Sequence, residues 1–167
     1  SVGMAKDLYN SKIYVKELFE KADDILKSNL SKIILNGPVE ELNQTENTQP
    51  AIFLVSYSIY EMIKRESGID LSKATFLAGH SLGEYSALTA VNSLGFDQAL
   101  KLLKKRGIAM QSAMSKGEGG MLAVLGTDIE DINKLLTENK EKYECYIAND
   151  NSKGQVVISG KSNDLDM

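Results

Sequence analysis

A serine stands between two glycines in the run Gly79-His80-Ser81-Leu82-Gly83, which has the spacing Gly-x-Ser-x-Gly. In this pattern the serine occupies a sharp turn between a strand and a helix, so its hydroxyl projects clear of neighbouring side chains. Such a hydroxyl can attack a carbonyl carbon and carry the acyl group as an ester. We therefore predict Ser81 as a nucleophile, with Gly79 and Gly83 making room for the turn. The alternative is a tight turn with an incidental serine.

The residues around the motif predict the strand and the helix that this turn requires. Residues 74–78 are mostly small or apolar, as in a buried strand of a parallel sheet. Leu82, Tyr85 and Leu88 then recur at helical spacing. The start of a helix favours developing negative charge, so the backbone amide of Leu82 is predicted to form half of an oxyanion hole.

A second candidate is an arginine on the apolar face of a later helix. The spacing predicts a helix over residues 96–115, and Arg106 falls in the middle of its apolar arc, whereas Lys104 and two other lysines fall on the other side. A guanidinium turned inward needs an anionic or carbonyl partner. That partner is either an internal acidic side chain or the carboxylate of a substrate.

The segment Gly-His-Ser-Leu-Gly-Glu-Tyr-Ser-Ala-Leu at residues 79–88 resembles the active-site segment of malonyl-CoA:acyl-carrier-protein transacylases and of related acyltransferase domains of fatty-acid and polyketide synthases. Further stretches match that family in order, at residues 2–8, 48–51, 105–107, 149–152 and 155–160. The resemblance implies that Arg106 binds the free carboxylate of the malonyl group. It also implies that Gln49 lies near the active site and supports it indirectly; the alternative is that Gln49 only makes hydrogen bonds at the start of its helix. Gly79 and Gly83 are expected to support the site through the turn.

The resemblance implies an enzyme of fatty-acid biosynthesis. It would transfer a malonyl group from malonyl-CoA to the phosphopantetheine thiol of acyl carrier protein, through a malonyl ester on Ser81 and without a cofactor. Alternatives are a serine esterase or lipase, in which water accepts the acyl group, and a non-catalytic fragment that binds the carrier protein.

The base that such a serine needs is not expected within the chain. His80 is the only histidine, and adjacent side chains leaving a strand point to opposite sides, so His80 should face away from the serine hydroxyl. The resembling family places its histidine beyond residue 167, and the second oxyanion donor is also missing. We therefore expect a fragment that lacks both ends of the family's domain and is inactive alone.

The predicted fold is α/β. Residues 1–117 are expected to form part of a parallel-sheet core like that of α/β-hydrolases, with the serine on its nucleophile elbow and a helix over residues 51–65 that Thr48 caps and Gly68 ends. Residues 118–167 are expected to form a partial ferredoxin-like subdomain, because strands at 121–125, 143–148 and 155–159 surround a helix at 129–139.

The composition excludes several classes of protein. A net charge of −4 and a pI near 5.1 speak against nucleic acid as a partner. No apolar run approaches the ~20 residues of a membrane span, so no membrane partner is expected. One cysteine and one histidine leave no metal-ligand cluster and suit a reducing cytoplasm. The cysteine, Cys145, lies in a strand-like run and is expected to be a packing residue.

Overall fold

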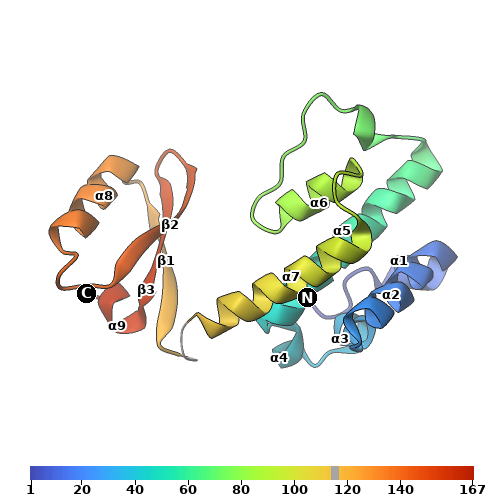
Figure 1. The fold of residues 1–167 in the computed structure, drawn as a ribbon, viewed down its shortest axis with the longest axis horizontal. Coiled ribbons are helices and arrows are strands. Elements are labelled where there is room, and N and C mark those ends of the chain that lie inside the picture. Colours follow the sequence, from blue (N-terminus) through green and yellow to red (C-terminus); the bar gives the residue numbers. More distant parts are fainter. Residues whose placement is uncertain (114–116) are drawn as a thin grey trace. The chain divides into compact units, whose positions relative to one another are not determined.

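The computed structural model describes residues 1–113 and 117–167. They form two compact units, Ser1–Gln111 and Ser112–Met167 (Figure 1). The larger unit contains α1 (Lys6–Ser11), α2 (Ile13–Leu26), α3 (Leu30–Asn36), α4 (Val39–Leu42), α5 (Thr45–Ser67), the 3-10 turn η1 (Leu71–Lys73), α6 (Gly83–Ala90) and all but the last residue of α7 (Phe96–Ser112). The smaller unit contains β1 (Gly119–Leu125), α8 (Ile129–Glu138), β2 (Cys145–Ser152), β3 (Gln155–Lys161) and α9 (Ser162–Leu165).

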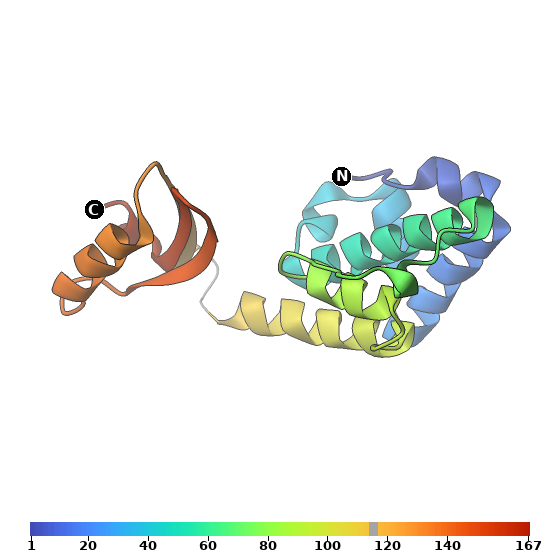
Figure 2. The ribbon, with the colours of Figure 1, turned by 90° about the horizontal axis from the view of Figure 1, so that it is seen from above.

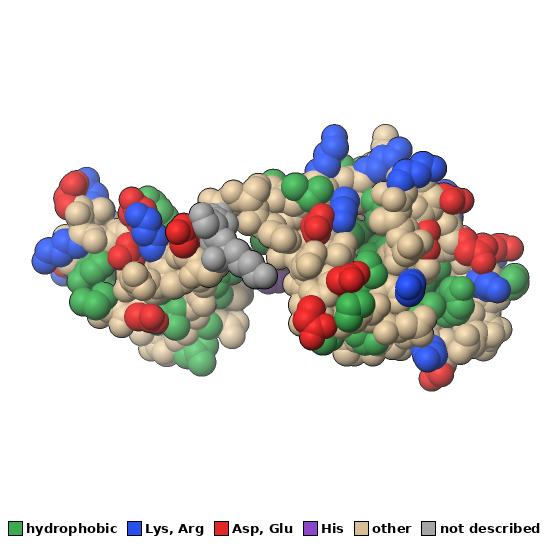
Figure 3. All heavy atoms as spheres, turned by 90° about the horizontal axis from the view of Figure 1, so that it is seen from below, with side chains coloured by type: hydrophobic (Ala, Val, Ile, Leu, Met, Phe, Trp, Pro, Cys, Tyr) green, Lys and Arg blue, Asp and Glu red, His purple; other side chains and the backbone are tan. Residues whose placement is uncertain are grey.

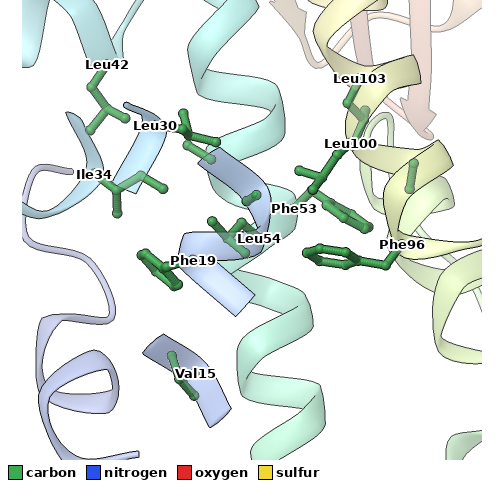
Figure 4. Close-up of a cluster of buried hydrophobic side chains, with 13 residues drawn as sticks. Val15, Phe19, Leu30, Ile34, Leu42, Phe53, Leu54, Phe96, Leu100 and Leu103 are labelled. Atoms are coloured by element: carbon green, nitrogen blue, oxygen red, sulfur yellow. The ribbon is translucent and has the colours of Figure 1, made fainter. Parts of the chain in front are cut away.

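The core of the larger unit lies between helices, each of which turns an apolar face inward. Five helices contribute to it (Figure 4), with buried residues that include Val15 and Phe19 of α2, Leu30 and Ile34 of α3, Leu42 of α4, Phe53 and Leu54 of α5, and Leu100 and Leu103 of α7. The rings of Phe53 and Phe96 lie 5.6 Å apart and join α5 to α7. These two helices lie side by side (Figures 1 and 2).

Helix α5 begins earlier than predicted and ends at the predicted glycine. Thr48 is not its N-cap, because the helix already starts at Thr45 and the hydroxyl of Thr48 donates to the carbonyl of Leu42. Pro50 consequently lies inside the helix, where it removes a single backbone hydrogen bond. Gly68 follows the last turn with a φ of 66°, in the left-handed region that glycine adopts without strain.

The strand predicted over residues 74–78 is not observed, so that prediction was wrong for this chain. The segment is irregular, and the Phe76 side chain is 89% exposed. A strand needs a hydrogen-bonded neighbour, and residues 1–113 contain no strand that could pair with this one. The parallel sheet expected in residues 1–117 is therefore absent from the described part of the chain, and the larger unit is helical.

The smaller unit contains a three-stranded antiparallel sheet with the order β1-β3-β2. Leu122 of β1, Ile158 of β3 and Ile147 of β2 lie opposite one another across it. Because both outer strands run antiparallel to β3, β1 and β2 are parallel, and α8 is the crossover between them. The predicted order of strand, helix, strand and strand is confirmed.

The described residues are thus rich in helix, with a small sheet in one unit. The sequence predicts a boundary between residues 117 and 118, within the glycine-rich stretch 116–120. The first residue of that stretch, Lys116, lies outside the described residues. Among the helices that the structure describes, α5 included, none is long and apolar enough to cross a membrane.

Candidate active site

Ser81 occupies a sharp turn, and only Leu82 separates it from the first residue of α6. Its φ of 56° lies in the left-handed region, which costs a residue with a side chain about 1–3 kcal/mol unless its surroundings hold it there. The surroundings include two backbone hydrogen bonds, from the amide of Gly83 to the carbonyl of His80 at 2.8 Å and from the amide of Glu84 to the carbonyl of Ser81 at 3.3 Å. A strained serine at the start of a helix is the geometry that the Gly-x-Ser-x-Gly spacing predicts.

The two glycines of the motif have different steric roles. A Cβ on Gly79 would lie 2.1 Å from the carbonyl carbon of Gly83 and 2.4 Å from the amide nitrogen of Glu84, so only glycine fits there. A Cβ on Gly83 would meet no atom of the described residues within 4 Å. The expectation that both glycines make room for the turn is therefore met by Gly79, while this part of the chain gives no steric reason for Gly83.

The backbone amide of Leu82 lies where α6 begins. Leu82 has helical dihedral angles, with a φ of −63°, and serves as the N-cap position of α6. The amides of the next three residues donate to the carbonyls of residues 80–82, and no acceptor for the Leu82 amide appears among the hydrogen bonds of the described residues. This amide can therefore donate to a negatively charged oxygen next to Ser81.

Arg106 reaches the serine from α7. Its Nη2 donates to the Oγ of Ser81 at 3.1 Å, and its Nη1 donates to the Oε1 of Gln49 at 2.7 Å. No carboxylate of the described residues lies within ion-pairing distance of Arg106. The internal acidic partner that the sequence left open is thus not found there, and the guanidinium keeps donor capacity for an anion beside the serine.

Gln49 holds the guanidinium in place from behind. Its side chain is only 4% exposed, and its Nε2 donates to the Sδ of Met110 at 2.9 Å while its Oε1 accepts from Arg106. With both ends of a buried amide engaged, its orientation is fixed. Met110 was not predicted as a site residue, although it follows Arg106 by one helical turn and so lies on the same face of α7.

A pocket of about 530 Å³ lies beside the serine. Its walls come from α5, α6 and residues 71–83, and its lining includes Ile52, Tyr60, Leu77, His80, Ser81 and Leu82. Tyr60 Oη donates to the carbonyl of Ala90 at 3.0 Å, which ties α5 to α6 across this region.

Metal-ligating side chains do not gather in the part of the chain that the structure describes. The described residues contain no group of three or more histidine, cysteine or acidic side chains that could hold an ion. Burial raises the pKa of the Cys145 thiol in β2, so the thiolate is disfavoured, as expected for a packing residue. On the face that Figure 3 shows, acidic and basic side chains are interspersed over the larger unit.

Comparison with known proteins places these features in a family. The family model described as acyl transferase domain matches residues 2–167. The malonyl CoA-acyl carrier protein transacylase of Bacillus subtilis (strain 168) is 42% identical over 167 residues, which cover 99% of this chain and 51% of that protein. The transacylase of the same name from Haemophilus influenzae is 42% identical over 160 residues, covering 96% of this chain and 51% of that protein.

Solved structures agree with the sequence comparisons. The acyl-carrier-protein-S-malonyltransferase from Bartonella henselae superposes with a TM-score of 0.91 and 40% identity, covering 99% of this chain and 53% of that one. A malonyl-transacylase solved in complex with the acyl-carrier protein of a type II PKS gives a TM-score of 0.88 and 37% identity, with the same coverage of 99% and 53%. The chain spans about half the length of the curated relatives it matches.

Proposed function

The chain belongs to the acyl transferase domain family, and on that premise we propose that the whole protein transfers malonyl groups from malonyl-CoA to the phosphopantetheine thiol of acyl carrier protein. The observation that carries the proposal is the 3.1 Å contact between Arg106 and the Oγ of Ser81. A cation in contact with a nucleophilic hydroxyl can bind the carboxylate at the far end of a short acyl group on that hydroxyl. The reaction requires no cofactor, and we place it in fatty-acid biosynthesis in the cytoplasm.

The transfer takes two steps. Ser81 Oγ attacks the thioester carbonyl of malonyl-CoA, the C–S bond breaks, and the serine proton passes through a base to the leaving CoA thiolate. The family resemblance places that base beyond residue 167. The thiol of the carrier protein then attacks the malonyl-serine ester, a C–S bond forms and the ester C–O bond breaks. The proton of the thiol passes through the same base to the oxygen of Ser81, which restores the hydroxyl. In both steps the Leu82 amide donates to the oxyanion.

The distance between the guanidinium and the serine supports malonyl as the acyl group. In malonyl the carboxylate carbon lies only ~2.5 Å from the reacting carbonyl carbon, because two C–C bonds join them. A cation that recognises the carboxylate must therefore lie within a few ångströms of the attacking oxygen, as Arg106 does. An acetyl group would leave that cation without its anion, and an esterase of neutral substrates would have no use for it.

We propose a finer fold for the whole protein as well. Residues 74–78 would join a parallel sheet of the α/β-hydrolase type, which their exposed Phe76 and the strained turn after them support. The smaller unit would be part of a ferredoxin-like subdomain, which the strand order β1-β3-β2 with a helix between β1 and β2 supports.

Mass spectrometry of the whole protein after incubation with malonyl-CoA tests the proposed function. We expect a malonyl ester on Ser81 that disappears in Ser81→Ala, persists in the control Ser93→Ala, and is discharged by acyl carrier protein. Ser93 is a suitable control because it is exposed and lies just after the same helix. An ester that water discharges as fast as the carrier protein favours the hydrolase. No ester at all favours the non-catalytic binding role.

A further inference from the structure

Helix α7 meets the first turn of α5 at a set of contacts next to the Arg106–Gln49 hydrogen bond. The Nζ of Lys104 lies 2.9 Å from the Oε2 of Glu46 and donates to the Oδ1 of Asn47 at 3.0 Å. One turn further along α7, Gly107 presses against the same place, because a Cβ there would lie 2.5 Å from the Cα of Glu46. We call Lys104, Glu46 and Asn47 the clamp.

The clamp differs from an ordinary surface ion pair. The side chains of Lys104 and Glu46 are only 24% and 30% exposed, and one ammonium group serves two acceptors on consecutive residues. The helical spacing predicts that Lys104 lies with two other lysines opposite the apolar arc. It faces α5 instead, because it precedes Gly107 by three residues and so shares the side of α7 on which the backbones touch.

The first turn of α5 depends on contacts of this kind. Pro50 has no amide hydrogen, so the carbonyl of Glu46 lacks the helical donor that an ordinary residue at position 50 would supply. A turn that has lost part of its own hydrogen bonding is held by its neighbours. The clamp and the close approach at Gly107 are the neighbouring contacts that fasten this turn to α7.

The position of this turn determines where Gln49 lies. Gln49 follows Glu46 by three residues on the same helix, and its Oε1 accepts from Arg106 at 2.7 Å. A shift of the turn along α7 would lengthen that bond and release the guanidinium from its place beside Ser81. An error of about 1 Å in the placement of a substrate-binding group can cost up to ~100-fold in rate.

From these contacts we infer that the clamp sets the specificity of the site for carboxylated acyl groups. Lys104, Glu46 and Asn47 are positioning residues: they hold Gln49, and through it Arg106, where the guanidinium can bind the substrate carboxylate. None of the three touches the reacting atoms. The inference rests on the proposed function, because only a carboxylated acyl group needs the guanidinium in that place.

Steady-state kinetics of the whole protein with malonyl-CoA and acetyl-CoA test the clamp. For Lys104→Met and for Glu46→Gln we expect kcat/KM for malonyl-CoA to fall about 5- to 10-fold, chiefly through KM, with acetyl-CoA changed less than about 2-fold. Lys105→Met is the matched control, since Lys105 is exposed on the same helix, and it should leave both substrates unchanged. The swapped pair Lys104→Glu with Glu46→Lys should restore most of the malonyl preference.

Two results would overturn the inference. One is an equal loss for both substrates that follows a lower Tm, since this means that the clamp only stabilises the fold. The other is unchanged malonyl kinetics in Lys104→Met and Glu46→Gln.

A separate measurement distinguishes failure of the clamp from failure of the proposed function. If the unaltered protein forms no malonyl-serine, the proposed function fails, and the clamp is then tested by NMR of Arg106. Its two Nη groups, held by different acceptors, should give distinct signals that merge in Lys104→Met, and signals that stay distinct there would overturn the clamp.

Discussion

The sequence predicts a strand both at residues 74–78 and at β3, but only β3 forms one in the structure. β3 lies between two partners and is hydrogen-bonded on both edges. Residues 74–78 precede the serine without a partner strand in the described part of the larger unit, and they form no strand. An apolar run thus indicates which residues can form a strand, while the presence of neighbours decides whether they do.

The turn that follows the unpaired segment nevertheless has the geometry expected of a nucleophile. Ser81 has its φ of 56°, Gly79 is in close contact with the backbone of Gly83, and Arg106 reaches the serine hydroxyl. The sheet of the smaller unit depends on pairing between distant strands, whereas this turn depends on close contacts with the start of α6 and on Arg106 of α7, which Gln49 of α5 holds in turn. The candidate site is therefore specified by helix packing and local sterics.

The largest effect should come from Gly79→Ala. The added Cβ would overlap the backbone of Gly83 at 2.1 Å, so the turn must open and move the hydroxyl of Ser81. We expect malonyl-serine formation in the whole protein to slow at least ~100-fold, measured by quenched-flow mass spectrometry. Gly83→Ala is the control, because its Cβ meets nothing in the described residues, and it should slow the reaction less than about 3-fold. Equal effects of the two substitutions would show that local sterics do not specify the turn.

The next effect concerns the cation of the site. Arg106→Ala removes the group that meets the substrate carboxylate, so we expect kcat/KM for malonyl-CoA to fall about 100-fold, with acetyl-CoA transfer unchanged or improved. Arg106→Lys should recover only part of the loss, because an ammonium group lacks the fork that contacts Gln49 and Ser81 together. Parallel losses for both acyl groups would mean that Arg106 holds the helices together and does not select the substrate.

The third effect lies in the sheet. A Cβ on Gly160 of β3 would lie 2.3 Å from the carbonyl oxygen of Glu144, so Gly160→Ala must disturb the pairing with β2. We expect it to lower the stability of the smaller unit by ~1–3 kcal/mol, seen as faster hydrogen exchange in β2 and β3. Exchange in α5 and α7 should not change. In the control Gly120→Ala the Cβ meets the end of the flexible Leu165 side chain at 3.1 Å, which can move aside.

The features that the sequence predicted depend on short-range spacing. The turn at Ser81, the inward face of α7 with Arg106 and the order of elements in the smaller unit all follow from residues a few positions apart. The family resemblance added Gln49, whose place beside Arg106 no local pattern indicates.

What the sequence did not predict depends on residues far apart in the chain. The clamp joins Lys104 to Glu46, and only the packing of α7 on α5 brings them together. The start of α5 was misjudged because the hydroxyl of Thr48 donates to Leu42 and does not cap a helix. The unpaired state of residues 74–78 follows from the absence of neighbouring strands in the described residues, which the segment's own composition cannot reveal.

The smallest effect, on stability, should come from breaking a surface network that joins α2 to α5 in the larger unit. Glu66 pairs with Lys12 and accepts from Tyr14 Oη at 2.9 Å. Hydrogen bonds from Lys12 and then Tyr14 lower the pKa of Glu66 from its ordinary 4.5. Because the folded pKa is the lower one, this contribution to stability is present above pH 4.5 and is lost as the pH falls through the folded value.

Glu66→Gln should therefore make the free energy of unfolding of the larger unit fall less steeply as the pH is lowered. The measurement is the free energy of unfolding from urea titrations below about pH 6, followed by hydrogen exchange in each unit. Glu17→Gln, on the exposed side of α2, is the control and should keep the original slope. The network is exposed, so added salt should weaken its contribution. The contrary result is that, in the unaltered protein, acid speeds hydrogen exchange in the sheet of the smaller unit as much as in α2 and α5. The two units would then not unfold separately, and the contrast between packed helices and paired strands would not extend to their stability.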